Sequence, residues 1–217
     1  MALQEILILR RLRKRPSRRT YSANPANLLS VGARLAGLAL AAVLTACSSP
    51  NPVLYTIAPA QGPVQSGSPK VIALQQIALP RYLERSQIVR SSENYRLDVM
   101  SNDWWGEPLG AMLSRVLIEE LSQRLPQSTV FGESGAVTAS PDATVELNMQ
   151  RLDEDASGNL VLQAQASVSF KGRPGQALRN FRFVVAPPAA DIQGEVNAIS
   201  SAVGQLADGL AAMLAGR

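Results

Sequence analysis

Alternating apolar and polar residues in the second half of the chain predict three β-strands. Apolar residues alternate with polar ones over 145–149 and over most of the longer segment 160–170, and a further strand is predicted at 181–185. This spacing of two is typical of strands with one buried face. Turn-forming residues at 153–159 and 171–175 separate the three segments, and turns this short join neighbouring antiparallel strands. The pattern therefore predicts an antiparallel meander.

The first half of the chain contains further segments of strand character. Residues 71–79 are apolar on both faces over much of their length, which indicates a central strand covered on both sides. Loops are predicted at 58–69, which is rich in Pro, Gly and Ser, and at 101–106, which contains both tryptophans of the chain. Weaker patterns predict strands at 53–57, 87–90, 95–100 and 130–131.

A helix is predicted for 108–125, because apolar residues recur every three or four positions in this segment. Pro108 suits the first turn of a helix, and Pro126 ends it. Glu120 and Arg124 lie off the apolar stripe, as does Glu119. The stripe consists of Leu109, Met112, Leu113, Val116, Leu117 and Leu121.

A second helix is predicted for 191–214, with Asp191 as its N-cap. Its apolar residues are spaced alternately by four and three, which forms a narrow heptad seam. This seam either packs on the sheet of its own domain or binds a partner helix. Together the elements predict a single α+β domain, a mostly antiparallel sheet with two main amphipathic helices packed on it. The seam residues are Ile192, Val196, Ile199, Val203, Leu206, Leu210 and Met213.

The charged residues divide the chain near Cys47, its only cysteine. Eight of the 21 basic residues precede Cys47, whereas only one of the 17 acidic residues does. The part after Cys47 therefore contains 13 basic and 16 acidic residues. The part after Cys47 therefore lacks the basic balance typical of nucleic-acid binding. The chain has no histidine, the most common general base and metal ligand, and the acidic cluster 153–155 is interpreted as a solvated turn. We predict no catalytic residues, no metal site and no enzymatic activity.

Residues 35–47 form a short apolar run that follows a basic segment. About ten apolar residues suit the hydrophobic region of a signal peptide, whereas about twenty are needed for a membrane-spanning helix. The run ends in Leu44, Thr45, Ala46 and Cys47, which match the lipobox of bacterial lipoproteins. This resemblance implies signal-peptidase recognition of Leu44, Thr45 and Ala46, cleavage before Cys47, and a diacylglyceryl group on its sulfur. A fatty acid such as palmitate would then acylate the new amino terminus.

Two other interpretations of the run remain, an uncleaved anchor helix and a core helix with an incidental thiol. In the lipoprotein interpretation, 1–46 is the signal peptide, 47–52 is the lipidated N-terminus with a polar spacer, and 53–215 is the folded domain. Serine directly after Cys47 resembles lipoproteins that are sent to the outer membrane. We therefore expect a periplasm-facing protein anchored in the outer membrane, with no cofactor besides its covalent lipid.

Three short motifs occur in the predicted domain. Residues 79–90 read LPRYLERSQIVR, residues 105–109 read WGEPL, and residues 55–59 read YTIAP. They resemble the P-x-Y-L-x-R-x-Q-I-V-x-R signature, the W-A-E-P-L helix entry and the Y-x-L-x-P opening strand of ABC-type transport auxiliary lipoproteins, the PqiC (YmbA) family. One residue is missing before Arg90, and Gly106 replaces the family's alanine. The motifs occur in the family's order and cover nearly the whole domain.

The resemblance implies an accessory subunit of a transport system. Such lipoproteins work beside MCE proteins, which form a conduit across the periplasm for lipids or other hydrophobic molecules, with an inner-membrane partner; some relatives accompany an ABC permease and ATPase. By resemblance, this chain docks the far end of the conduit at the outer membrane, supports lipid transport and membrane integrity, and assembles as a homo-oligomeric ring. The alternative is a periplasmic lipoprotein that holds a lipid or other hydrophobic ligand between sheet and helices.

Candidates for partner binding come from the densest part of the signature and from the tryptophans. They are Tyr82, Arg85, Trp104 and Trp105. In another interpretation Arg85 only pairs with Glu84 or Asp98, since surface ion pairs are common and weak. Adjacent residues of an extended segment point in opposite directions. One tryptophan can therefore join the core while the other contacts a partner or the membrane interface, where tryptophan is favoured.

Overall fold

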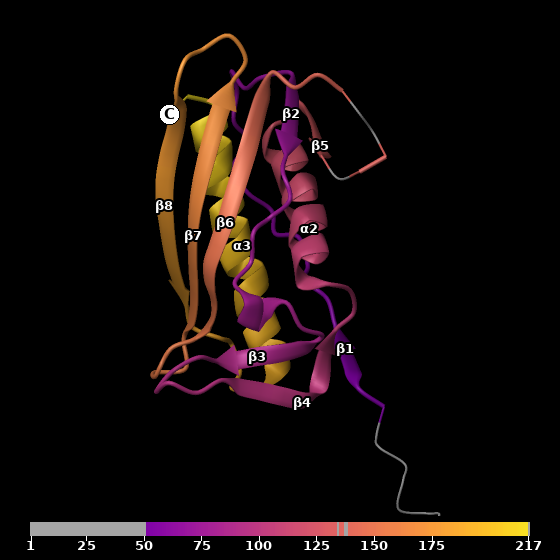
Figure 1. Ribbon diagram of the computed structural model, residues 1–217, viewed down its shortest axis with the longest axis vertical. Helices are drawn as coiled ribbons and strands as arrows, with labels where there is room; N and C mark the ends of the chain where they lie inside the picture. Colours follow the sequence, from indigo (N-terminus) through magenta and orange to yellow (C-terminus); the bar gives the residue numbers. More distant parts are fainter. Residues whose placement is uncertain (1–50, 134, 137–138, 217) are drawn as a thin grey trace, which may run out of the picture. The chain divides into compact units, whose positions relative to one another are not determined.

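The computed structural model describes residues 51–133, 135–136 and 139–216 (Figure 1). The predicted signal peptide with Leu44, Thr45, Ala46 and Cys47 lies outside the described residues. The strands are β1 (Val53–Tyr55), β2 (Val71–Leu74), β3 (Gln87–Ser91), β4 (Asp98–Trp105), β5 (Thr129–Gly132), β6 (Ala143–Glu154), β7 (Leu160–Phe170) and β8 (Gln176–Val185). The helices are the one-turn 3-10 helix η2 (Arg81–Leu83), α2 (Leu109–Arg124) and α3 (Ile192–Leu214).

The long strand β6 lies at the centre of a mixed sheet. β7 pairs antiparallel with β6, and β8 pairs antiparallel with β7, which confirms the predicted meander. Two strands pair parallel with the opposite edge of β6: β2 with its beginning and β3 with its end. Beyond them, β5 lies parallel to β2, β4 lies antiparallel to β3, and β1 lies parallel to β4. The α+β class is confirmed, and the sheet combines parallel with antiparallel pairs.

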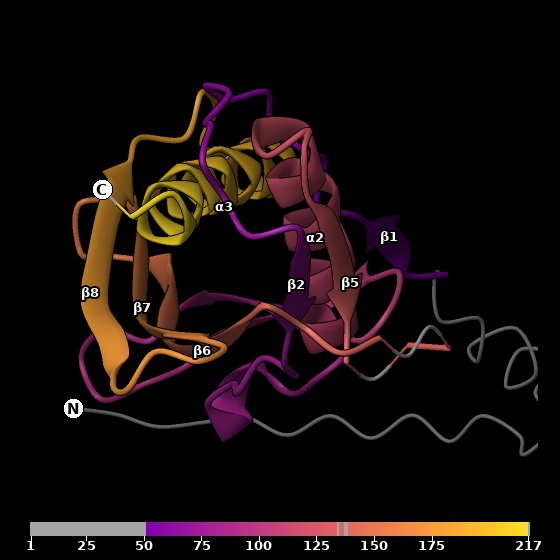
Figure 2. The same cartoon turned by 90° about the horizontal axis from the view of Figure 1, so that it is seen from above.

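The apolar seam of α3 faces the interior of its own domain. The helix packs against β6, β7, β8 and α2 (Figure 2), and its seam residues are buried or half-buried. A side chain at Gly209 would collide with the ring of Phe181 from β8. The predicted N-cap is confirmed, because Asp191 Oδ1 accepts a hydrogen bond of 2.7 Å from the backbone N–H of Gly194. The interpretation that places this helix on the sheet is confirmed, and its seam is not available to a partner helix.

The predicted central strand is confirmed but is shorter than the pattern indicated. Ile72, Ala73 and Leu74 of β2 are buried, so both faces of the strand are covered. The strand ends at Leu74, and its pairing with β6 resumes only where Ala78 lies opposite Asn148. Within the described part of the chain, neither long helix combines the length and apolarity needed to cross a membrane.

Both tryptophans lie in a strand, so the loop predicted at 101–106 is wrong. The strand predicted at 95–100 starts three residues later, because Asn94 and Tyr95 form a turn with φ values of 55° and 61°. Pairing with β1 on one side and β3 on the other then extends β4 through both tryptophans. These partners are distant in sequence, and the local pattern around the tryptophans gives no indication of them.

Candidate partner-binding groove

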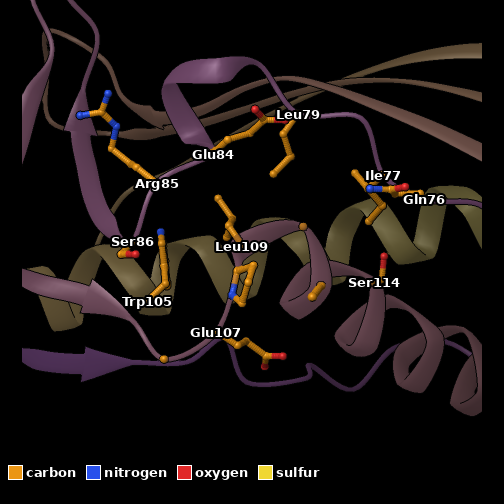
Figure 3. Close-up of a pocket in the computed structure, with 14 residues that line it drawn as sticks. Gln76, Ile77, Leu79, Glu84, Arg85, Ser86, Trp105, Glu107, Leu109 and Ser114 are labelled. Atoms are coloured by element: carbon orange, nitrogen blue, oxygen red, sulfur yellow. The ribbon is translucent and has the colours of Figure 1, made fainter. Parts of the chain in front are cut away.

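An open groove of about 800 Å³ lies between the connection that follows β2, the segment after η2, the end of β4 and the first turns of α2 (Figure 3). In Figure 3, Ile77 and Leu79 of the connection face Leu109 of α2 across the groove. Trp105 lies beside Leu109 and is only 7% exposed. The groove therefore has apolar walls that belong partly to the core.

Backbone hydrogen bonds bring the three family-like motifs together beside this groove. The N–H of Trp105 donates to the carbonyl of Ser86 at 2.7 Å, which joins the motif 105–109 to the motif 79–90. The N–H of Gly106 donates to the carbonyl of Tyr55 at 2.9 Å, which adds the opening strand. Segments from 79–90 and 105–109 form facing walls of the groove. Residues far apart in the sequence thus build one surface feature.

Charged side chains lie on the rim of the groove. Glu107 pairs with Arg115 of α2, with a shortest N–O distance of 2.7 Å. Glu84 and Arg85 contribute to the rim from the segment after η2. Arg85 is exposed, and among the described residues it forms no ion pair, so its predicted alternative pairing with Glu84 or Asp98 is not found. The guanidinium of Arg85 is therefore a positive group available to an acidic partner.

Tyr82, although part of the same signature, does not line the groove. Its hydroxyl donates a 2.9 Å hydrogen bond to Asp153 Oδ2 at the end of β6. Burial, followed by the charge of Asp153, raises the pKa of Tyr82 well above its usual range. Tyr82 thus fixes η2 to the sheet. The groove brings together Arg85 and Trp105 of the four predicted residues, while the partner-binding roles of all four remain predictions.

Trp104 also lies away from the groove, on the other face of β4. It is half-buried, and its indole N–H donates to the carbonyl of Ser101 at 3.1 Å. Trp105 points toward the core, as expected for neighbouring residues of a strand. The two tryptophans therefore have different environments, as the sequence predicted. They lie in a strand, however, and not in the predicted loop.

The acidic cluster 153–155 is not the solvated turn that was predicted. Asp153 and Glu154 are buried at the end of β6, and only Asp155 belongs to the following turn. Arg151 pairs with Asp153 at 2.7 Å and Arg90 pairs with Glu154 at 3.1 Å. Arginine partners from the same strand and from β3 explain why these carboxylates can be buried, because buried charges need partners.

A third carboxylate, Glu195 of α3, is buried near this cluster without a hydrogen-bond partner. Both of its carboxyl oxygens are inaccessible, and neither has a partner within the described structure. Burial and, to a smaller extent, the nearby charge of Glu154 raise the pKa of Glu195, while Arg90 lowers it, and the net pKa is about 8. Glu195 is therefore mainly protonated at neutral pH. No feature of the sequence distinguished this residue.

Glu120 and Arg124 of α2 are buried, although they lie off the helix's apolar stripe. The loop 58–69 covers this side of α2: the N–H of Ala60 donates to Glu120 Oε1 at 2.7 Å, and Arg124 Nη1 donates to the carbonyl of Ala60 at 3.1 Å. Arg124 also donates through Nε to Asp208 Oδ1 of α3 at 2.6 Å. Burial raises the pKa of Glu120 to about 7. These two residues hold the loop and both helices together.

The structure is a small α+β domain whose three family-like motifs meet beside one groove. The profile of the family described as "ABC-type transport auxiliary lipoprotein component" matches residues 53–211, and the chain belongs to this family. The α+β fold and the family resemblance expected from the sequence are thereby confirmed. No curated protein matches the chain.

Two solved structures show the same fold at low sequence identity, and a third is less similar. A crystal structure of an uncharacterized protein shares 17% identity with a TM-score of 0.64, covering 76% of this chain and 99% of the other. A protein from Xanthomonas campestris shares 15% identity with a TM-score of 0.61, covering 76% of this chain and 96% of its own. PelC from Paraburkholderia phytofirmans, a dodecamer, shares 11% identity over 72% of this chain and 98% of its own, with a TM-score of 0.41. That likeness is too distant to inform on the assembly of this chain.

Proposed function

We propose that the chain is a lipid-anchored accessory subunit of an intermembrane transport system. It docks an MCE-type, periplasm-spanning component at the outer membrane and thereby supports lipid transport and membrane integrity. Membership of a transport auxiliary lipoprotein family supports the lipoprotein class. Cys47 is the last residue of the segment that matches a lipobox and is the only cysteine of the chain, so it is the one residue whose sulfur can carry the lipid.

The observation that carries this proposal is the groove where the family-like motifs converge. Most signature side chains have structural roles: Leu83, Ile88 and Val89 are buried, Tyr82 binds Asp153, and Arg90 pairs with Glu154. Arg85 is the exception, since it is exposed and lies beside an apolar groove, with its guanidinium directed away from Leu109 in Figure 3. Apolar pockets with a flanking arginine are typical of the energetic centres of protein interfaces. We infer that a partner segment places an apolar side chain in the groove and a carboxylate beside Arg85.

Reversing the charge at Arg85 will weaken partner binding without unfolding the domain. We expect R85E to lower co-isolation of the MCE-type partner by about tenfold or more, because a like charge then faces the partner's carboxylate. The measurement is affinity isolation of the full lipoprotein from solubilised membranes, with the MCE-type protein quantified by mass spectrometry.

Arg81 provides the matched control, because it is an exposed arginine of η2 that does not line the groove. R81E makes the same charge change a short distance away and should leave co-isolation within about twofold, as expected for a surface position outside the contact. Equal retention of the partner by R85E and R81E would contradict docking at the groove.

A second function is favoured by the size and lining of the groove. About 800 Å³ falls within the range of small-molecule sites, and apolar walls with a few polar rim groups are typical of them. The domain would then hold a lipid or another hydrophobic ligand. Native mass spectrometry of the gently extracted protein separates the two functions, because a stoichiometric bound lipid favours the second. The homo-oligomeric ring remains a prediction that would need surfaces other than the α3 seam.

A further inference from the structure

Leu54 and Trp104 form an exposed apolar pair on the outer face of β1 and β4. They lie directly opposite each other in the parallel ladder, so their side chains share one face. Leu54 is 63% exposed, and Trp104 is half-buried. The neighbouring register pair, Tyr55 and Trp105, lies on the other face, toward the core.

Packing within the domain does not explain this pair. β1 is a three-residue strand at the edge of the sheet, and Val53 beside Leu54 is 48% exposed. The strand is held by its ladder with β4 and by the hydrogen bond of 3.0 Å from the Tyr55 hydroxyl to Asp103 Oδ1. The side chain of Leu54 is not needed for either interaction, because the ladder is formed by the backbone and the hydrogen bond by Tyr55. Single exposed leucines are common on protein surfaces, so the exposure of Leu54 does not by itself indicate a contact surface.

The position is distinctive because β1 is the first element after the expected lipid anchor. Val53 lies six residues after Cys47, and an extended chain spans at most about 3.5 Å per residue. The pair is therefore held within about 20–25 Å of the lipidated sulfur, a distance set by that extended-chain limit. Leucine and tryptophan are the side chains that amphipathic surfaces place in the membrane interface, and tryptophan is enriched at the headgroup level.

We propose that Leu54 and Trp104 contact the lipid surface of the same membrane that holds Cys47. This inference rests on the proposed function, because it requires the anchor at Cys47. Contact at β1 and β4 adds a second attachment to the tether, so the domain takes a defined orientation and does not swing freely. Trp105, one residue after Trp104, lines the groove. Because the groove lies on the other face of β4 from Trp104, the contact also fixes the orientation of the groove relative to the membrane.

Fluorescence quenching by brominated lipids tests the contact. The full lipoprotein is reconstituted into phosphatidylethanolamine–phosphatidylglycerol vesicles with or without bromine on the acyl chains. We expect quenching at least about twofold stronger in the wild-type protein than in W104F, because an interfacial indole lies near the acyl chains whereas Trp105 is buried. L54S should weaken the quenching, whereas L178S should not. Leu178 of β8 is a matched control, since it is 68% exposed on a strand far along the chain from the anchor.

Each outcome of this experiment decides a different point. Equal quenching of wild type and W104F in protein that floats with the vesicles overturns the lipid contact and leaves the anchor intact. Protein that fails to float overturns the anchor, and the contact with it. Protection of Trp104 from aqueous acrylamide without bromine quenching would show that protein covers the pair, and it would also overturn the proposal.

Discussion

R124M will lower the free energy of unfolding by about 3–5 kcal/mol, the magnitude expected when one partner of a buried charge cluster is removed. The Arg124 side chain is 1% exposed and donates to Asp208 and to the carbonyls of Ala60, Glu120 and Gly204. Methionine fills much of the same space but satisfies none of these acceptors. The loop 58–69 and helix α3 therefore lose a shared attachment to α2.

Arg115 supplies the control for this prediction, because it lies on the same helix and also pairs with a carboxylate. Its side chain is 49% exposed, and exposed ion pairs contribute under about 1 kcal/mol. Chemical denaturation of R124M and R115M measures both changes. A loss below about 1 kcal/mol in R124M would show that Arg124 does not hold the helices and the loop together.

E195Q will change the pH dependence of stability: we expect it to raise the free energy of unfolding by at most about 1 kcal/mol at pH 5 and by several kcal/mol at pH 9. Folded Glu195 keeps its proton up to a pKa of about 8, whereas the unfolded chain loses it above about 4.3. Between these values the unfolded state binds fewer protons, so wild-type stability falls as pH rises, by up to about 1.4 kcal/mol per pH unit. Glutamine has the shape of the protonated acid and cannot ionise.

The measurement is a series of denaturation curves from pH 5 to pH 9 for wild type, E195Q and E146Q. Glu146 is an exposed residue of β6, so E146Q should follow the wild-type curve. In all three proteins, Glu120 also lowers the stability as the pH rises, but over a narrower pH range that ends near its pKa of about 7. If the free energy of unfolding of E195Q changed with pH in the same way as that of the wild type, a buried, protonated Glu195 would be contradicted.

The elements that the sequence predicted correctly are those whose pattern is local. The alternation over 160–170 and the spacing of apolar residues in α2 and α3 reflect burial on one face, and short turns join the meander. The pairing of β2 and β3 with β6 connects distant segments in parallel, and no turn signal indicates it. The same reason explains the missed extension of β4, whose partners β1 and β3 are set by the tertiary structure.

Charged residues were the hardest to place from sequence. Glu120, Arg124, Asp153 and Glu195 were expected outside the core or not noticed, because charged side chains are seldom buried without a partner. Their burial depends on the loop 58–69 and on arginines that only the fold brings near. The groove could be anticipated in part, since its walls are the family-like motifs 79–90 and 105–109. Only the structure shows that Arg85 lies at the groove whereas Tyr82 binds Asp153.

The anchor is the central claim, because both the docking role and the membrane contact depend on it. Intact-mass analysis of the protein extracted from bacterial membranes tests it most directly. We expect a polypeptide that begins at Cys47 and carries a diacylglyceryl group on the sulfur and an acyl chain on the amino terminus. A polypeptide that begins elsewhere, with an unmodified Cys47 thiol, would contradict it.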